Sequence, residues 1–175
     1  VVISANDPTA MDQLVKECIK NELGYVYDVG QQVTNITVDQ LKLGLYKAKI
    51  LFVNDYELGT ILGRTGYTEN QLIAMIPLII TTLGAKGTRL TGSTISTPLT
   101  VPAVKGIKAV DPTGAGDAYR AGFLHAYLRG DSLKVCAQLG STVATYTVEL
   151  HGTQTHTFTL ADVKEKHYSA YGSKS

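Results

Sequence analysis

Short hydrophobic runs alternate along the first half of the chain with segments in which hydrophobic residues recur every three or four positions. The runs are typical of β-strands, and the three-to-four spacing is typical of helices that bury one face. The predicted strands are residues 1–5, 24–29, 50–54 and 77–84. The helices predicted between them start at Pro8 and cover residues 37–48, 56–64 and 68–76, with Thr37 and Gln40 spaced as a capping box.

The predicted strands are hydrophobic at nearly every position rather than at alternate positions. Strands of this kind are covered by helices on both faces, as in parallel sheets. The alternation of strand and helix favours the same arrangement. We therefore predict an α/β fold with three layers, α/β/α, and a mostly parallel sheet.

The second half of the chain has a different pattern. Residues 85–92 continue the fourth strand as a hairpin-like piece, and two long helices are predicted at 116–129 and 132–148. Gly130 ends the first of these helices, and Asp131 or Ser132 caps the second.

Composition narrows the classes of protein. The 175 residues are 44% hydrophobic and 18% charged, with a net charge of +1, so no strong field favours nucleic acid or an anionic membrane. No hydrophobic run approaches the ~18 residues of a membrane span. The opening VVISANDP lacks the basic and hydrophobic segments of a secretory signal, and the two cysteines have no metal-binding spacing. We expect a cytoplasmic protein with reduced thiols.

Ligands of open α/β sheets bind beyond the carboxyl ends of the strands. The segments at these places are polar or rich in glycine: residues 6–7, 28–32, 54–57, 82–87 and 111–117. The last lies in VDPTGAGDAYRAG, residues 110–122. Gly114 and Gly116 permit close approach of a ligand to the backbone, and the first amides of the following helix form an anion site.

Two known phosphate loops do not match this segment. No GxxxxGK[ST] string occurs, and the dinucleotide fingerprint would need a small residue where Tyr119 stands. Asp117 has two interpretations. It is a first-turn or capping acid of the helix, or it is a general base that takes a proton from a hydroxyl beside the anion site.

Four motifs, in order, resemble those of the ribokinase-like (PfkB) carbohydrate kinase family. VDPTGAGDAYRAGFL resembles its D-x-x-G-A-G-D signature, and VNDYE at 53–57 resembles its N-x-x-E motif. TTLGAKGTRL at 81–90 resembles its T-x-G-x-x-G nucleotide loop, and GSTVATYTVELHGTQT resembles its C-terminal helix and closing loop. The stretches ISANDPTAM and YDVGQQ resemble the adenosine-kinase-like branch. Taken alone, VNDYE also fits a helix start, and TLGAKG also fits a plain β-turn.

The resemblance implies a ribokinase-like fold and an ATP-dependent phosphotransferase that acts on a hydroxymethyl group of a sugar or nucleoside. Asp117 would be the catalytic base, in a loop with Gly114, Ala115 and Gly116, and the amides of Ala115, Gly116 and Asp117 would form the anion hole. The resemblance further implies a monovalent cation, often K⁺, held by Asp111 and Thr113. Asn54 and Glu57 would position Mg²⁺ and phosphates, with Glu57 acting through water. The residues along the nucleotide would be Thr82, Gly84 and Gly87, with Ser141 and Gly152 toward the adenine, and Asn6 would contact the substrate.

Family members are usually longer, and their N-terminal half carries a di-glycine motif, much of the acceptor pocket and a lid. None of these is visible here, so we interpret residues 1–175 as a single domain, the C-terminal nucleotide-binding and catalytic portion of a kinase. Three expectations follow: this portion alone is inactive, it exposes hydrophobic sheet surface, and the kinase forms a homodimer through its lid. The alternative is a non-catalytic nucleotide-binding or regulatory domain. A dehydrogenase is disfavoured by Tyr119.

Overall fold

The computed structural model describes residues 1–172, and the chain divides into two compact units. The first unit comprises residues 1–83 and 89–99, and the second comprises residues 84–88 and those from Thr100 onward. None of the helices within residues 1–172 combines the length and hydrophobicity that crossing a bilayer requires.

The first unit carries a parallel sheet. Strands β1 (Val2–Ile3), β2 (Tyr25–Tyr27), β3 (Ala48–Asn54) and β4 (Leu78–Thr82) pair in sequence order, and all three pairs are parallel. The six strands have the order β1-β2-β3-β4-β5-β6, with β5 at Thr88–Thr91 and β6 at Leu99–Val101. The mostly parallel sheet is therefore confirmed.

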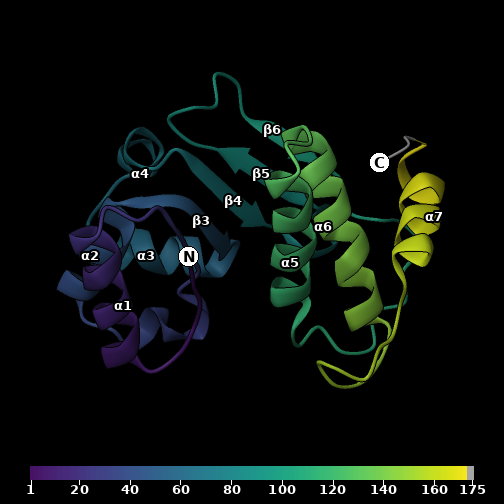
Figure 1. The fold of residues 1–175 in the computed structure, drawn as a ribbon, viewed down its shortest axis with the longest axis horizontal. Helices are drawn as coiled ribbons and strands as arrows, with labels where there is room; N and C mark the ends of the chain where they lie inside the picture. Colours follow the sequence, from purple (N-terminus) through teal and green to yellow (C-terminus); the bar gives the residue numbers. More distant parts are fainter. Residues whose placement is uncertain (173–175) are drawn as a thin grey trace. The chain divides into compact units, whose positions relative to one another are not determined.

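Helices of the first unit follow the strands as the hydrophobic pattern predicted (Figure 1). They are α1 (Pro8–Lys20), α2 (Val38–Tyr46), α3 (Asp55–Thr65) and α4 (Glu69–Met75), with a short 3₁₀ turn η1 at Gly30–Thr34. Helix α1 turns Met11, Val15 and Cys18 into the core, whereas Leu14 is 45% exposed. The buried stripe of α1 is thus narrower than its hydrophobic spacing suggests.

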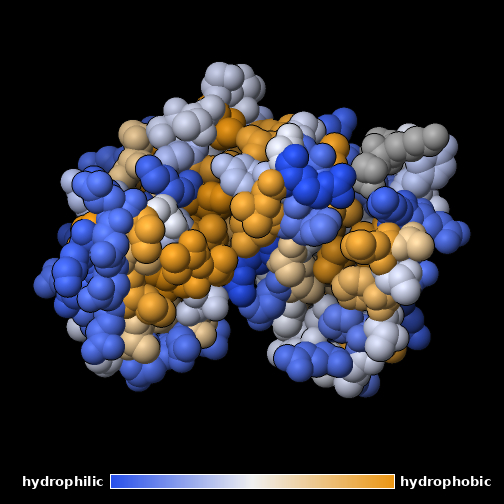
Figure 2. Space-filling view, in the orientation of Figure 1, coloured by the Kyte–Doolittle hydropathy of each residue, from blue (hydrophilic) through white to orange (hydrophobic). Residues whose placement is uncertain are grey.

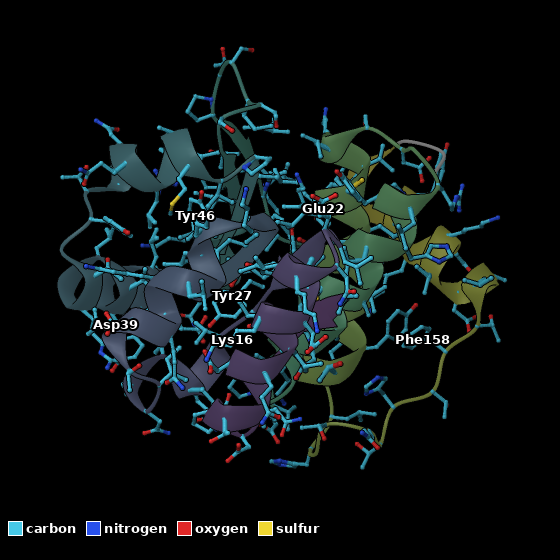
Figure 3. All side chains as sticks on the ribbon, turned by 60° about the vertical axis from the view of Figure 1, so that its left-hand side comes forward. Lys16, Glu22, Tyr27, Asp39, Tyr46 and Phe158 are labelled. Atoms are coloured by element: carbon cyan, nitrogen blue, oxygen red, sulfur yellow. The ribbon has the colours of Figure 1, made fainter. Side chains whose placement is uncertain are left out.

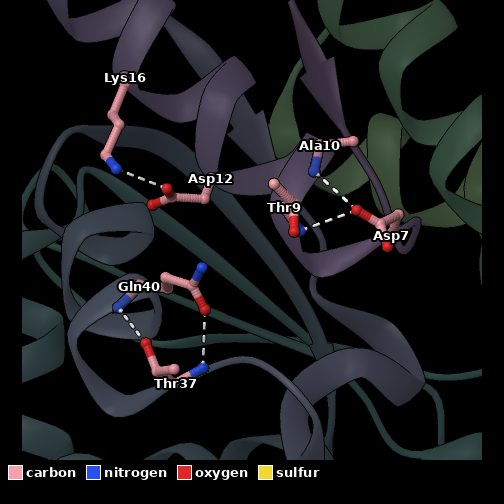
Figure 4. A network of polar contacts seen from close by, with 7 residues as sticks. All are labelled: Asp7, Thr9, Ala10, Asp12, Lys16, Thr37 and Gln40. Carbon is pink, nitrogen blue, oxygen red and sulfur yellow. Dashed lines mark hydrogen bonds and ion pairs between the residues drawn. The ribbon is translucent and has the colours of Figure 1, made fainter.

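Side-chain caps fix where these helices begin (Figure 4). The Asp7 carboxylate accepts hydrogen bonds from the Thr9 and Ala10 amides, at 2.9 and 3.0 Å, and so satisfies two free N–H groups of α1. At α2, Thr37 and Gln40 form the predicted capping box, with bonds of 3.2 and 2.9 Å. The capping hydrogen bonds fix the conformation of the residues just before each helix, and polar residues of the candidate site lie in these segments.

The core of the first unit explains one glycine inside a helix. Gly44 of α2 lies against the Tyr27 ring, and a Cβ there would stand 2.4 Å from Tyr27 Cζ. Tyr27 is 1% exposed, and its burial raises the pKa of its hydroxyl far above the usual value. Without a side chain at Gly44, helix and strand can approach closely enough to bury the ring.

The second unit is built from α5 (Ala115–Leu128), α6 (Leu133–Val148) and α7 (Leu160–Tyr171), together with the 3₁₀ turn η2 at Gly84–Lys86. Helices α5 and α6 lie side by side, in green in Figure 1. Gly122 and Gly140 let them approach, because a Cβ at either would stand 2.9 Å from a backbone oxygen of the other helix. Ser132 is the cap of α6, which resolves the choice between Asp131 and Ser132.

Helix α7 was not predicted from the hydrophobic pattern. It begins at a capping box in which Thr159 and Asp162 exchange hydrogen bonds, and it buries only Val163 and His167. Phe158, which is labelled in Figure 3, lies just before α7 and stacks on Tyr146 of α6 with ring centroids 4.7 Å apart. The Lys166 ammonium lies over the Tyr146 ring and pairs with Glu149 at 2.7 Å. These contacts attach α7 to the end of α6.

Candidate active site

The N-terminus of α5 presents an uncapped pair of backbone amides. The N-cap residue is Gly114, at φ 81°, and it supplies no side-chain hydrogen bond. The Ala115 amide donates to Pro112 O at 3.1 Å and the Ala118 amide to Gly114 O at 3.0 Å. Within residues 1–172, the amides of Gly116 and Asp117 donate to no protein atom. Together with the helix dipole, these two amides can bind an anion.

Asp117 stands beside these amides as the third residue of α5. Its side chain is 73% exposed, so its carboxylate is accessible to a molecule in solvent. The Arg120 guanidinium, one turn further on, pairs with Asp117 Oδ1. An accessible carboxylate next to an anion site is the arrangement that general-base catalysis on a hydroxyl requires.

Asp111 ties this loop to the loop that follows α6. Its Oδ1 accepts the Thr113 amide at 2.9 Å, and its Oδ2 accepts the Gly152 amide at 3.0 Å. The hydrogen bonds from Thr113, and then the one from Gly152, lower the pKa of the Asp111 carboxyl to about 2. The amides of Val110 and Asp111 both donate to Val148 O, at 2.7 and 3.2 Å. The predicted residues Asp111, Thr113 and Gly152 are therefore brought together.

Gly114 has two reasons to be glycine. Its φ of 81° is one that L side chains rarely adopt, and a Cβ there would meet Thr153 side-chain atoms at 3.1 Å. By contrast, a Cβ at Gly116 would meet no atom within 4 Å. Gly114 serves the packing of the loop, whereas the space above Gly116 is open.

A second group of predicted residues lies in the first unit, at the carboxyl ends of β1, β3 and β4. Asn54 and Glu57 form a capping box at the start of α3, since the Glu57 amide donates to Asn54 Oδ1 at 2.7 Å and the Asn54 amide donates to Glu57 Oε2 at 2.9 Å. The Thr82 hydroxyl donates to Val53 O at 3.4 Å, and Asn54 is in register with Thr82. At the end of β1, Asn6 Oδ1 accepts the Asp7 amide at 2.8 Å.

The environment of Glu57 suits a cation. Burial raises the pKa of its carboxyl, the negative charge of Asp28 adds to this increase, and the hydrogen bonds of Asn54 oppose it. Two neighbouring carboxylates, one of them partly buried, favour a nearby positive charge, and Mg²⁺ prefers such oxygen ligands. Within residues 1–172, no three His, Cys, Asp or Glu side chains gather as a metal site. A magnesium ion here would depend on water and phosphate for its other ligands.

The glycines of the nucleotide-loop motif differ in their surroundings. Gly84, at φ 56°, has open space where a Cβ would stand. Gly87, at φ 101°, is packed so tightly that a Cβ would lie 2.1 Å from Val101 O. Only Gly84 leaves room for a ligand, whereas Gly87 is required by the backbone beside it.

Ser141 lies apart from the other predicted residues of the second unit. It is 7% exposed on α6, and its hydroxyl bonds to Tyr171 of α7. The Tyr171 hydroxyl in turn donates to Pro102 O at 2.9 Å. In this structure Ser141 therefore supports the packing of α7.

Two charged residues, one in each unit, were given no role from the sequence. Arg120 was missed, although its position three residues after Asp117 on one helix is the spacing of an ion pair. Asp28 was noted only as the start of a polar segment, and its effect on Glu57 follows from the adjacency of β2 and β3.

The chain belongs to the PfkB family of carbohydrate kinases, whose model matches residues 1–159. It is 31% identical over 166 residues to a nucleoside kinase of Methanocaldococcus jannaschii, covering 95% of this chain and 54% of that protein. It is 37% identical over 131 residues to a nucleoside kinase of Methanothermobacter thermautotrophicus, covering 74% of this chain and 41% of that protein. The family resemblance seen in the motifs is thus confirmed.

Solved structures agree with this assignment. The Burkholderia thailandensis nucleoside kinase in complex with inosine superposes with a TM-score of 0.94 at 25% identity, covering 99% of this chain and 58% of that one. The M. jannaschii nucleoside kinase superposes with a TM-score of 0.87 at 30% identity, covering 97% and 56%. The ribokinase-like fold class is confirmed, and the chain spans about half the length of the curated relatives it matches.

Proposed function

We propose that this chain carries the catalytic portion of a kinase that transfers the γ-phosphoryl group of ATP to a hydroxymethyl group of a nucleoside or sugar. The observation that carries the proposal is the exposed Asp117 carboxylate beside the backbone amides of Gly116 and Asp117, which donate to no protein atom within residues 1–172. A nucleoside acceptor is favoured, because the relatives named above are nucleoside kinases and one structure among them contains inosine.

In the proposed reaction, Asp117 takes the proton of the acceptor hydroxyl while that oxygen bonds to the γ-phosphorus. The bond from the γ-phosphorus to the bridging oxygen of ADP breaks in the same displacement. Negative charge on the phosphoryl oxygens is stabilised by the amides of Gly116 and Asp117, and Gly114 and Ala115 shape the turn that presents them. Asn6 would contact the acceptor.

The nucleotide would lie along Asn54, Thr82 and Gly84, with the backbone of Gly87 beside it and Gly152 toward the adenine. An ADP-inosine complex of the B. thailandensis enzyme is consistent with ATP as the donor. Mg²⁺ would neutralise phosphate charge near Glu57. Asp111 and Thr113 would hold K⁺, and each Asp111 oxygen that accepts one amide keeps a lone pair for a cation. Homodimerisation and a cytoplasmic location belong to the same proposal.

The proposal is tested on the longest natural chain that contains these 175 residues. ADP release is measured with ATP, Mg²⁺ and a panel of nucleosides and sugars, for the natural chain, Asp117→Asn and the control Asp131→Asn. We expect Asp117→Asn to lose at least about 10³-fold in kcat, with ATP affinity by calorimetry within a few-fold and the control unchanged. ATP binding without turnover on any acceptor would instead favour a non-catalytic nucleotide-binding domain.

A further inference from the structure

Arg120 occupies an unusual position for an arginine on a surface helix. Its side chain is 13% exposed, whereas its partner Asp117 is 73% exposed, and the guanidinium Nη2 lies 2.5 Å from Asp117 Oδ1. A second ion pair at the other end of the same helix is looser: Arg129 Nε lies 3.5 Å from Asp131 Oδ2, and the Arg129 side chain is 48% exposed.

The pair of Arg120 with Asp117 itself contributes little to stability, because it joins residues three apart on a helix and Asp117 is exposed to solvent. The consequence of the pair is geometric, because a mostly buried, planar donor fixes the rotamer of a carboxylate that would otherwise turn freely in solvent.

The pair also makes the two oxygens of the Asp117 carboxylate different from each other. Within residues 1–172, the hydrogen bonds of the Asp117 carboxylate involve Oδ1 alone. Oδ2 is left for a proton donor from outside the protein. A general base is effective only when its lone pair meets the hydroxyl within hydrogen-bond reach, and a misplacement of about 1 Å can cost about 10²-fold in rate.

We propose that Arg120 is a positioning residue that holds the Asp117 carboxylate by Oδ1, so that Oδ2 faces the acceptor hydroxyl. This inference rests on the proposed function, in which Asp117 is the base. It differs from a direct role in binding phosphate, in which Arg120 would contribute to nucleotide affinity rather than to the rate of transfer.

The experiment compares Arg120→Gln, Arg120→Lys and the matched control Arg129→Gln in the longest natural chain. The first readout is NMR of Asp117, namely its carboxylate ¹³C resonance and its Hα–Hβ couplings, assigned with Asp117→Asn. We expect Arg120→Gln to shift the resonance and to average the couplings, and Arg129→Gln to leave both unchanged. Unchanged Asp117 signals in Arg120→Gln would overturn the proposal, whether or not the chain has kinase activity.

The second readout is steady-state kinetics. We expect Arg120→Gln to lower kcat by about 10- to 100-fold with KM for ATP and acceptor within about 3-fold, and Arg120→Lys to recover part of the loss. A rise in KM for ATP at unchanged kcat would show phosphate binding and contradict positioning. If Asp117→Asn is inactive and Arg120→Gln turns over normally, the positioning role is wrong while the proposed function stands. If Asp117→Asn is fully active, the proposed function fails, and the NMR result still decides whether Arg120 restrains the carboxylate.

Discussion

Two glycines at the start of α5 have different roles: Gly114 is needed for the fold of the loop, whereas Gly116 is proposed to serve catalysis. Gly114→Ala places a Cβ at φ 81° against Thr153, so we expect it to lower the free energy of unfolding by about 1 kcal/mol or more. Gly116→Ala meets no atom and lies within the helix, so it should leave stability unchanged or raise it by up to about 1 kcal/mol.

The two variants are compared by denaturant unfolding and by turnover. If the transferred phosphoryl group lies against the Gly116 amide, Gly116→Ala should reduce turnover although it folds as well as the natural chain. Full turnover in a stable Gly116→Ala variant would contradict the anion hole at this amide.

The lowered pKa of Asp111 predicts that the stability of the fold depends on pH. Its pKa is about 2 in the folded chain, below the ordinary value of 3.8. The ionised carboxylate therefore stabilises the fold at every pH above about 4. That stabilisation should disappear as the pH falls through about 4 toward 2. In thermal unfolding, Asp111→Asn should therefore have a lower Tm than the natural chain at pH 7, and the difference should shrink between pH 4 and pH 2. Asp131→Asn serves as the control, and a difference that is constant with pH would count against this account.

At the scale of elements, the sequence predicted helices α1 to α6 and strands β1 to β4. The helices have hydrophobic residues every three or four positions, and most of them begin at a capping residue. The strands are short runs of hydrophobic residues. Helix α7 could not be, since only Val163 and His167 are buried and two positions define no period. Its capping box, T-x-x-D at 159–162, was the available signal. Strand β6 was not predicted, because Leu99 and Val101 stand among polar residues and prolines rather than in a hydrophobic run.

The candidate site was predictable to a similar extent. Motif order placed Asp117, Asn54 and Glu57 at strand and helix ends, where the structure has them. The pairing of Asp117 with Arg120 and the burial of Ser141 depend on how side chains pack, and linear spacing does not determine packing.

The cap of α7 gives a test at this scale. Thr159 Oγ1 accepts the Asp162 amide at 3.2 Å, and Thr159→Ala removes this bond. We expect a loss of about 0.5–2 kcal/mol in the stability of α7, measured as faster amide hydrogen exchange in residues 160–171. Thr157→Ala, two residues earlier and exposed, is the matched control. Equal exchange in both variants would show that the cap does not hold the helix.

At the scale of the molecule, the sheet formed by the described residues 1–172 has β1 at one edge, and this edge exposes hydrophobic side chains. Strand β1 is the first in the strand order, and Val1 and Val2 are 59% and 47% exposed. Figure 2 shows hydrophobic residues, in orange, around the N-terminus marked in Figure 1. Exposed hydrophobic edges promote pairing between chains.

We therefore expect the isolated 175-residue chain to self-associate in light scattering, and Val2→Lys to shift it toward the monomer. The control is Leu128→Lys, because Leu128 is 83% exposed but lies at the end of α5. If both substitutions act equally, general surface hydrophobicity and not the strand edge drives association.

The central claim is that the α5 loop transfers a phosphoryl group with Asp117 as base. The most direct measurement is ³¹P NMR of the longest natural chain with ATP, Mg²⁺ and inosine, run in parallel on Asp117→Asn. The account predicts a growing phosphomonoester signal, matched by loss of the ATP γ-phosphate signal, in the natural chain and none in the variant. Equal growth of the phosphomonoester signal in the variant would contradict it.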